Sequence, residues 1–321
     1  MAAGRPDRAD PLRRARRPAR PAHPRHPGPA GGRVIRPAAA VEVLRAGALT
    51  TVQDLGRPGW AHLGVPRSGA LDPAALRLAN RLVGNPEAAA GLEITLGGCL
   101  LRFTTATTVA VTGADTDLRA GARPADLGRP LSLPAGALLR IAPPRAGLRN
   151  WLAVAGGFDV PPVLGSRSTD TLSGLGPAPL RDGDLLPLGA PTGHPAPVDV
   201  TPGPAPPAEL RLRLTLGPRD DWFTAEALHR LLHTPYTVGP VGNRVGARLA
   251  GAALPRAVAG ELPSEGVVLG AVQVPADGQP LVFLADHPTT GGYPVVGVVA
   301  DVTPLAQARP GTTVRFHGPQ R

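Results

Sequence analysis

The sequence predicts a mainly β protein in which many short strands are joined by turns and only a few short helices occur. Gly and Pro each occur 41 times in 321 residues, and such frequent punctuation favours short elements over long helices. Aromatic residues make up only 3% of the chain, so the core must be built from Val, Leu, Ala and Ile. The leucines at positions 210, 212, 214 and 216 alternate with polar residues, which buries one side of a strand.

Further strands are predicted at short apolar runs along the whole chain. They cover residues 92–96, 108–111, 137–141, 151–154, 267–274, 280–284 and 312–316. Three turns that end in glycine come directly before strand-like residues, at 134–136, 181–183 and 309–311. Glycine supplies the positive φ that such turns require, so we expect a tight reversal at each.

Helices are predicted at three places only. Asp72 is expected to cap a helix over residues 73–83, with Pro73 at its first position and Gly84 just past its end. A second helix is expected to begin after Thr224, and a short third one after Thr303.

Two segments of biased composition divide the chain. Residues 1–40 are rich in Arg, Pro and Ala and lack the apolar content needed for a core, which predicts a disordered tail. Residues 190–208 are rich in proline and are expected to form a semi-rigid linker. The remaining segments, residues 41–189 and 209–317, are expected to be two domains.

The net charge of +10 suggests a nucleic-acid partner, but its distribution argues against one. Ten Arg and two Asp within residues 1–40 account for +8 of this charge, so the rest of the chain is nearly neutral. No apolar run approaches the roughly 18 residues of a membrane span, and no apolar core of a secretory signal follows the basic tail. Cys99 is the only cysteine, which excludes an intrachain disulfide. We expect a cytoplasmic protein that does not bind a membrane.

A first group of polar residues and glycines lies between a predicted strand and the first helix. Asp54 and Arg57 fall within residues 51–59, and Ser68 and Asp72 follow in residues 68–72. Two interpretations remain open. The segment could line a substrate pocket, or Asp54 could simply pair with Arg57 while Asp72 only caps the helix.

A second group follows the apolar residues 152–155. Gly156 and Gly157 are followed by the hydroxyl-rich segment 165–170, which carries Arg167. Backbone N–H groups, hydroxyls and a guanidinium are suited to a phosphate or carboxylate, although neither nucleotide-binding glycine motif is present.

A third group spans residues 286–294, where Asp286 precedes two threonines and two glycines. It could be a backbone nest for an anion, or a tight β-turn that needs small residues. Arg244 and Glu265 add a cation and a carboxylate to the same part of the chain. This set of residue types suggests recognition of a small polar molecule and not a transition-metal site. The histidines do not support a metal site either: His229 and His233 have a metal-compatible spacing but no third ligand nearby.

Several motifs occur together in the order typical of one family. They are VQDLGRPG, HLGVPRSGALD, LRLANRLVGN, LEITLGG, LAVAGGFDVPPVLGSRST, LRDGDLLPLG, AVQVPADGQP, ADHPTTGGYP and LAQARPG. The chain therefore resembles the KipA or allophanate-hydrolase-subunit-2 family, also called the biotin-dependent carboxyltransferase family, from about Val41 to Phe316. Two stretches depart from the usual pattern: GNRVG at residues 242–246 replaces SDRMG, and DHPTTGGYP at 286–294 replaces DRQTTGGYP.

The resemblance implies a fold of two tandem cyclophilin-like β-barrels. It also implies a component of an ATP-dependent 5-oxoprolinase that opens 5-oxo-L-proline to L-glutamate, corresponding to the C-type subunit of that enzyme. The implied partners are the KipI-like B-type subunit and the A-type subunit. The implied cofactor is ATP, with or without magnesium, bound by the complex.

The resemblance, carried over position by position, implies a set of site residues. The expected catalytic residues are Asp54, Arg57, Arg167 and Asp286. The expected substrate- or nucleotide-binding residues are Ser68, Asp72, Gly156, Gly157, Ser166, Thr169, Arg244, Glu265, Gln273, Thr289, Thr290, Gly291 and Gly292. Arg167 and Arg244 are expected to meet anionic groups, and Asp286 to orient the substrate or a magnesium ion.

Two alternatives remain open at this point. One is the carboxyltransferase component of a biotin-dependent urea or amide carboxylase; because the chain has no lysine, biotin would have to arrive on another protein. The other is a non-enzymatic regulator that binds a KipI-type kinase inhibitor.

Overall fold

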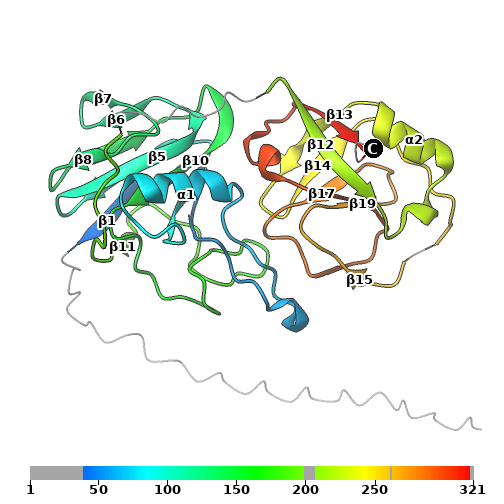
Figure 1. The fold of residues 1–321 in the computed structure, drawn as a ribbon, viewed down its shortest axis with the longest axis horizontal. Helices are drawn as coiled ribbons and strands as arrows, with labels where there is room; N and C mark the ends of the chain where they lie inside the picture. The colour runs from blue at the N-terminus through cyan, green and yellow to red at the C-terminus, as the bar shows by residue number, and fades with distance from the viewer. Residues whose placement is uncertain (1–38, 199–206, 261, 319–321) are drawn as a thin grey trace, which may run out of the picture. The chain divides into compact units, whose positions relative to one another are not determined.

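The computed structural model describes residues 39–198, 207–260 and 262–318, and these residues form a mainly β structure (Figure 1). The predicted tail lies almost entirely outside the described residues, as does the middle of the predicted linker. We refer to residues 39–198 as the first half and to residues 207–318 as the second half. The predicted mainly β fold class is confirmed.

The strands of the first half form two sheets. In strand order, one consists of β11 (Leu185–Pro187), β1 (Ala40–Arg45), β4 (Cys99–Phe103), β9 (Leu138–Ile141), β6 (Leu118–Ala120) and β7 (Arg123–Ala125). The other consists of β2 (Leu49–Gln53), β3 (Gly91–Thr95), β10 (Ala146–Val154), β5 (Thr107–Asp115) and β8 (Leu131–Leu133). The inner faces of both sheets supply one buried cluster, which includes Val41, Leu92, Leu101 and Val154.

The second half contains a closed barrel, which leaves its seven strands without an unpaired edge. Its strands are β12 (Glu209–Leu216), β19 (Val295–Val299), β16 (Ala271–Gln273), β17 (Leu281–Phe283), β14 (Gly246–Ala250), β13 (Tyr236–Gly242) and β20 (Thr313–His317). A separate ribbon pairs β15 (Glu265–Gly266) with β18 (Thr290–Gly291). The predicted alternation in β12 is confirmed for Leu210, Leu212 and Leu214, which are buried, but not for Leu216, which is exposed at the end of the strand.

The two halves share part of their hydrophobic core. The cluster that fills the barrel also contains Leu76 and Trp151 of the first half. Polar contacts reinforce this junction: the Gln307 side chain accepts from the backbone N–H groups of Leu148 and Arg149 and donates to the Arg149 carbonyl. The described residues of the two halves therefore belong to one compact unit.

The three predicted helices are present. Asp72 caps α1 (Pro73–Leu82) and accepts from the Ala75 N–H at 2.9 Å, while Thr224 caps α2 (Ala225–His233) in the same way at 3.1 Å. The third is a 3₁₀ helix, η3 (Thr303–Gln307). Two further 3₁₀ helices, η1 (Ala61–Leu63) and η2 (Asp220–Trp222), were not predicted.

One predicted strand was wrong over half of its length. Residues 267–274 were expected to be continuous, but β16 begins only at Ala271, and a turn at Gly270 with φ +82° precedes it. Val268 and Leu269 are exposed, so the unbroken apolar run concealed a turn. The glycine turns at 136, 183 and 311 are confirmed by their positive φ.

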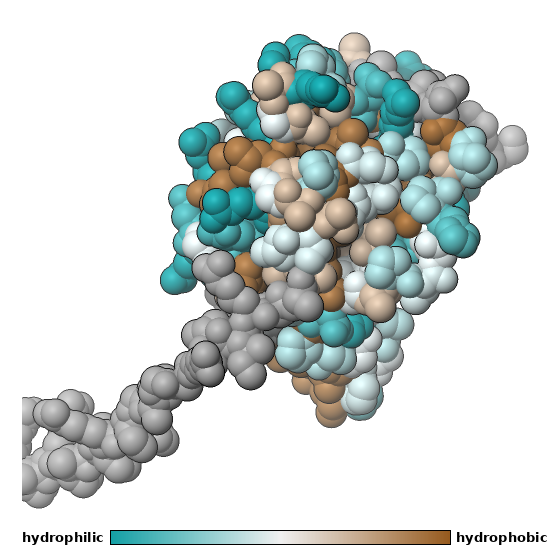
Figure 2. All heavy atoms as spheres, turned by 90° about the vertical axis from the view of Figure 1, so that its left-hand side faces the viewer, coloured by the Kyte–Doolittle hydropathy of each residue, from teal (hydrophilic) through white to brown (hydrophobic). Residues whose placement is uncertain are grey.

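The surface of the first half mixes polar and apolar residues. Figure 2 shows the molecule from the left-hand side of Figure 1, and on this face hydrophobic residues are distributed among hydrophilic and intermediate ones.

None of the helices in the described ranges combines the length and the apolar character that crossing a bilayer requires.

Candidate functional site

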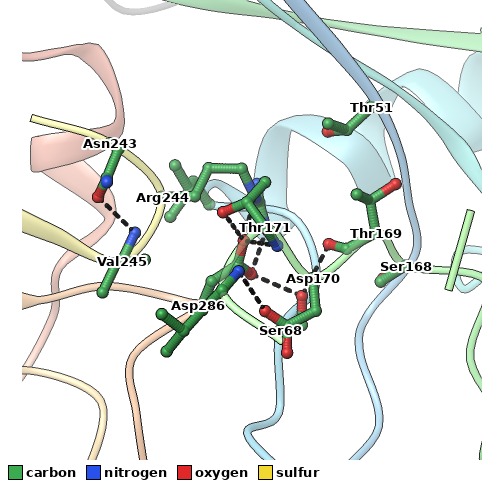
Figure 3. Close-up of polar contacts among 12 residues, drawn as sticks. Thr51, Ser68, Ser168, Thr169, Asp170, Thr171, Asn243, Arg244, Val245 and Asp286 are labelled. Carbon is green, nitrogen blue, oxygen red and sulfur yellow. Dashed lines mark hydrogen bonds and ion pairs between the residues drawn. The ribbon is translucent and has the colours of Figure 1, made fainter. Parts of the chain in front are cut away.

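A buried ion pair between Arg244 and Asp286 lies at the junction of the two halves (Figure 3). Arg244 lies in the turn between β13 and β14, and Asp286 follows β17 by three residues. The guanidinium donates twice to the carboxylate, from Nε at 2.9 Å and from Nη2 at 3.0 Å. Neither side chain is exposed to solvent, and this bidentate geometry is the strong form of such a pair.

The first half completes the coordination of this pair. Asp286 also accepts from the Ser68 hydroxyl at 2.6 Å, and from both the hydroxyl and the backbone N–H of Thr171 at 2.7 and 2.9 Å. On the other side, Arg244 donates to Glu93 at 2.5 Å and to the Gly69 carbonyl at 2.6 Å. Arg149 lies 3.6 Å from the same Glu93 carboxylate. Two guanidinium groups and two carboxylates thus balance one another in a buried cluster.

The electrostatics of the cluster keep its central pair charged. Burial by itself would raise the pKa of Asp286, but the Arg244 guanidinium and the hydroxyl and N–H donors hold that pKa below its ordinary value. Burial would likewise lower the pKa of Arg244, and the carboxylates of Glu93 and Asp286 raise it instead. Arg244 of the second half and Glu93 of the first therefore supply each other's counter-charge across the junction, while Arg244 also neutralises Asp286 within its own half.

A second buried carboxylate, Asp54, has a different environment within the first half. It accepts from the hydroxyls of Ser166 and Ser168, both at 2.6 Å, and from the N–H groups of Arg167 and Gly56 at 2.6 and 2.8 Å. No ion pair joins it to Arg57 or to any other described residue. Arg57 is buried too, and it donates to the carbonyls of Ser168 and Val163.

The segment 165–171, here called the hydroxyl loop, connects the two carboxylates. Its serines bind Asp54, and Thr171 binds Asp286. Ser68 lies between them, 3.0 Å from the Thr169 carbonyl and 2.6 Å from Asp286. The structure therefore brings together Asp54, Arg57, Ser68, Ser166, Thr169, Arg244 and Asp286 in one network. Within it, Arg57 Nη1 and Thr169 Oγ1 are buried and have no described partner, so they retain capacity to bind a polar group.

A pocket of about 170 Å³ adjoins this network. Ser68 links the two, because it lines the pocket and donates to Asp286. Arg67 and His287, the neighbours of Ser68 and Asp286 in sequence, line the pocket together with Asp301 and Thr303. The pocket wall thus combines a cation, a carboxylate, an imidazole and two hydroxyls with a larger apolar lining, which includes Leu71, Leu269 and Val302.

Several predicted site residues lie elsewhere or have local roles. The Arg167 side chain turns away from the network, donating to the Val160 carbonyl and pairing with Asp159 at 3.1 Å. Gly156 has φ +91° and lies so close to Gly189 that a side chain would collide with its carbonyl, so it serves backbone packing. Gly157 lies beside Ala89 and Ala90.

The remaining predictions fall around the ribbon of β15 and β18. Glu265 pairs with Arg219 at 2.9 Å, and the Gln273 amide donates to the Tyr293 carbonyl at 2.9 Å beside Gly291. Thr290 and Gly291 form β18, Gly292 follows it, and Thr289 accepts from the Val267 N–H through its carbonyl. No hydrogen bond or ion pair among the described residues joins this group to the Asp286 network.

Asp72 caps α1, and its carboxyl pKa is raised by burial.

Sequence reasoning missed Glu93, Arg149 and Thr171. A signal for Glu93 was available, since a carboxylate between Leu92 and Ile94 in a fully buried strand must find a partner. Among the described residues, no group of three or more His, Cys, Asp or Glu side chains could hold a metal ion. His229 and His233 stack on each other, with ring centroids 4.0 Å apart.

Comparison with protein families supplies the identification. Residues 63–318 match the model of the carboxyltransferase domain, subdomain A and B. The chain belongs to this carboxyltransferase domain family. The match contains the Ser68, Glu93, hydroxyl-loop, Arg244 and Asp286 positions of the network, so the junction described above lies within the family's domain.

Named members of the carboxyltransferase domain family are similar over most of the chain. It is 40% identical to the C-type subunit of 5-oxoprolinase from Escherichia coli, over 86% of this chain and 90% of that protein. It is 33% identical to the C-type subunit of 5-oxoprolinase from Haemophilus influenzae over the same shares. A urea amidolyase of Lachancea kluyveri is 34% identical, but this chain spans only 17% of it.

Solved structures of the carboxyltransferase domain family have the same fold. The K. lactis urea amidolyase superposes with a TM-score of 0.81 at 32% identity, covering 88% of this chain and 19% of that one. The protein TTHA0988 superposes with a TM-score of 0.79 at 39% identity, covering 88% of this chain and 56% of that one. In both, the domain is one part of a longer chain.

Proposed function

We propose that the chain is the C-type subunit of an ATP-dependent 5-oxoprolinase, which opens 5-oxo-L-proline to L-glutamate. The observation that carries this proposal is the 40% identity to the Escherichia coli protein of that name, over nine-tenths of the relative's length. The urea amidolyases, by contrast, extend far beyond the region they share with this chain.

The chemistry of the reaction fits the polar groups at the junction. A five-membered lactam is a poor electrophile, so ATP would phosphorylate the amide oxygen and thereby activate the carbonyl carbon for attack by water. The ring C–N bond then breaks, and hydrolysis releases ADP, phosphate and L-glutamate. Phosphoryl transfer asks a protein mainly to position its substrates and to stabilise charge. The network of Ser68, Arg244 and Asp286 is buried and fully hydrogen-bonded, which suits it to hold the pocket wall rigid.

The size of the pocket bears on where each substrate binds. At about 170 Å³ it is well below the roughly 300–1,000 Å³ typical of pockets for drug-sized ligands. We therefore place the small lactam in this pocket, and the nucleotide, with or without magnesium, at a site completed by partner subunits. The lactam would meet Arg67 and Ser68 there.

The partners follow from the same proposal. The KipI-like B-type subunit and the A-type subunit would complete the enzyme. In TTHA0988 the shared domain is 56% of the chain, so this relative joins the domain to further sequence that the present chain does not match. Two exposed apolar side chains offer surface for contact with a partner subunit. Leu269 lines the pocket, and Leu63 lies five residues before Ser68 in the sequence.

The test is reconstitution of the three subunits from purified components. We expect 5-oxoproline-dependent ATP hydrolysis and stoichiometric glutamate formation with all three, and loss of glutamate formation when this chain is omitted. Undiminished glutamate formation without this chain overturns the proposal.

One alternative activity has a specific observation in its favour. The family model and the urea amidolyase structures indicate a carboxyltransferase domain, so a biotin-dependent carboxylation of urea or a related amide is a second candidate. The chain has no lysine to carry biotin, so a biotinylated carrier would have to be added. Carrier-dependent carboxylation of urea, with no response to 5-oxoproline, would favour this activity.

Tight binding of a KipI-type kinase inhibitor without any turnover would favour a regulatory role.

A further inference from the structure

His287 contributes an imidazole to the wall of the pocket. His287 directly follows the buried Asp286 and lines the pocket with Arg67, Ser68 and Asp301. Its ring packs against Phe283, with centroids 6.1 Å apart, and only 7% of the residue is exposed. The ring is therefore held in position and is largely shielded from solvent.

One hydrogen bond determines which ring nitrogen carries the proton. Nδ1 of His287 lies 2.7 Å from the Pro288 carbonyl oxygen. A carbonyl can only accept, so Nδ1 must donate and must hold the hydrogen. In the neutral ring Nε2 then has a free lone pair, and the hydrogen bond recorded for this ring within the described ranges is that of Nδ1. Nε2 is therefore available as an acceptor.

Burial keeps the ring neutral near pH 7. Burial lowers the pKa of His287, and the Pro288 hydrogen bond and the carboxylates of Asp286 and Asp170 oppose this only in part. Asp286 is neutralised by Arg244, and Asp170 accepts from the Ser173 hydroxyl and from two backbone N–H groups. From the pocket side, Arg67 adds a positive charge and Asp301 a negative one.

Arg67 complements this acceptor with an available cation. The Arg67 side chain is exposed and forms no ion pair with any described residue. Arg57, by contrast, is buried. Asp301 limits the number of negative charges that the pocket tolerates, so a single carboxylate is favoured over a phosphate dianion.

We propose that Nε2 of His287 and the guanidinium of Arg67 form a specificity subsite for a small monocarboxylate that carries an N–H group. The N–H donates to Nε2, and the carboxylate binds Arg67. This inference rests on the proposed function for the choice of probe, because 5-oxo-L-proline has one carboxylate and one lactam N–H.

The experiment is calorimetric titration of the full chain with 5-oxo-L-proline and with its lactone analogue, in which oxygen replaces the ring N–H. The wild-type protein should bind the lactam about tenfold more tightly than the lactone, because the lactone presents an oxygen lone pair to Nε2 instead of a donor. His287→Phe, which retains a ring against Phe283, should bind both probes equally and weakly. His287→Gln, which retains an acceptor, should restore part of the preference.

Two controls separate the subsite from general effects. His233→Phe, on the exposed face of α2, should leave lactam affinity unchanged. Arg67→Gln should weaken both probes by a similar factor, because both have the carboxylate. Because the pKa of His287 is lowered, the lactam affinity of the wild type should fall only as the pH drops below about 6.5, since a protonated Nε2 cannot accept, and His287→Gln should not show this fall.

The outcomes are distinguishable from those of the reconstitution test. A lactam preference that survives in His287→Phe, or no saturable binding of either probe to the wild type, overturns the subsite. If the preference is present but the three subunits do not hydrolyse 5-oxoproline, the subsite stands and the proposed function fails. Preferential binding of urea that is insensitive to Arg67→Gln also overturns the subsite, since urea has no carboxylate.

Discussion

Two buried aspartates, Asp54 and Asp286, are satisfied in opposite ways. Asp54 takes four hydrogen bonds from neutral donors, all of them in the first half. Asp286 takes a bidentate bond from the Arg244 guanidinium within the second half, and three more hydrogen bonds from Ser68 and Thr171 of the first. One carboxylate is solvated by its own half, whereas the other depends on the junction.

The difference indicates what each cluster does for the molecule. A cage of hydroxyl and N–H donors can form as soon as the hydroxyl loop folds over Asp54. The ion pair gains its full set of partners only when both halves are docked, because Arg244 also needs Glu93 on β3. A mispositioned junction would leave charges buried without partners, so the cluster specifies how the halves fit together.

Replacing Arg244 should have the largest effect on stability. Arg244→Met removes the only cation that contacts both Glu93 and Asp286 among the described residues, and we expect a loss of about 3–5 kcal/mol in the free energy of unfolding. Urea denaturation measures this. Arg248→Met is the matched control, since its pair with Asp277 is half exposed at 3.6 Å, and it should cost less than about 1 kcal/mol. Equal losses for the two variants would contradict a special role for the junction.

Acid should weaken the junction by a smaller amount. The folded-state pKa of Asp286 lies below its ordinary value, because Arg244 and the hydroxyl donors outweigh burial. Its charge therefore stabilises the fold above the pKa of an unfolded aspartate, about 3.9, and that contribution is lost as the pH falls through the lower folded value. Asp286→Asn should be less stable at pH 7, and its stability should decline less than that of the wild type below about pH 4. Parallel declines in a series of denaturation curves would show that Asp286 does not contribute to the acid sensitivity.

Sequence reasoning was most successful where the determinants are local. The cap at Asp72, the Pro73 start of α1 and the glycine turns depend on residues only a few positions apart. It also selected Asp54, Ser68, Arg244 and Asp286, which the fold brings into one network. The sequence does not show which distant residues become their hydrogen-bond partners. Glu93, for example, is 151 positions away from Arg244 in the chain.

The exceptions have physical causes as well. Arg167 was expected to meet an anionic group in the site; in the structure its backbone N–H binds Asp54, while its guanidinium holds the Asp159 carboxylate and the Val160 carbonyl outside the network. A residue type does not reveal whether its side chain or its backbone faces a site. The run at residues 267–274 failed because apolar composition alone does not distinguish a strand from an exposed turn.

The Asp54 cage should tolerate loss of charge better than the ion pair does. Asp54→Asn keeps one acceptor oxygen but turns an N–H₂ group towards hydroxyl and N–H donors, so we expect a loss of about 1–3 kcal/mol. Denaturation of Asp54→Asn and Arg244→Met in parallel makes the comparison direct. A larger loss for Asp54→Asn would reverse our ranking of the two clusters.

The smallest predicted effect concerns Asp72, which the sequence predicted to bind substrate or nucleotide but whose observed hydrogen bond is a helix cap. Asp72→Ala removes the acceptor for the Ala75 N–H and should cost about 1 kcal/mol. Burial raises the pKa of Asp72, with the carboxylates of Asp301 and Glu93 adding to this, so its charge is disfavoured in the folded state. Asp72→Asn keeps a capping oxygen without that charge and should be at least as stable as the wild type at pH 7. Thr224→Ala, which removes the cap of α2, is the matched control and should cost about as much as Asp72→Ala. If Asp72→Asn preserves stability but abolishes lactam binding, Asp72 contributes to the site as well as to the helix cap, which would contradict a role in capping alone.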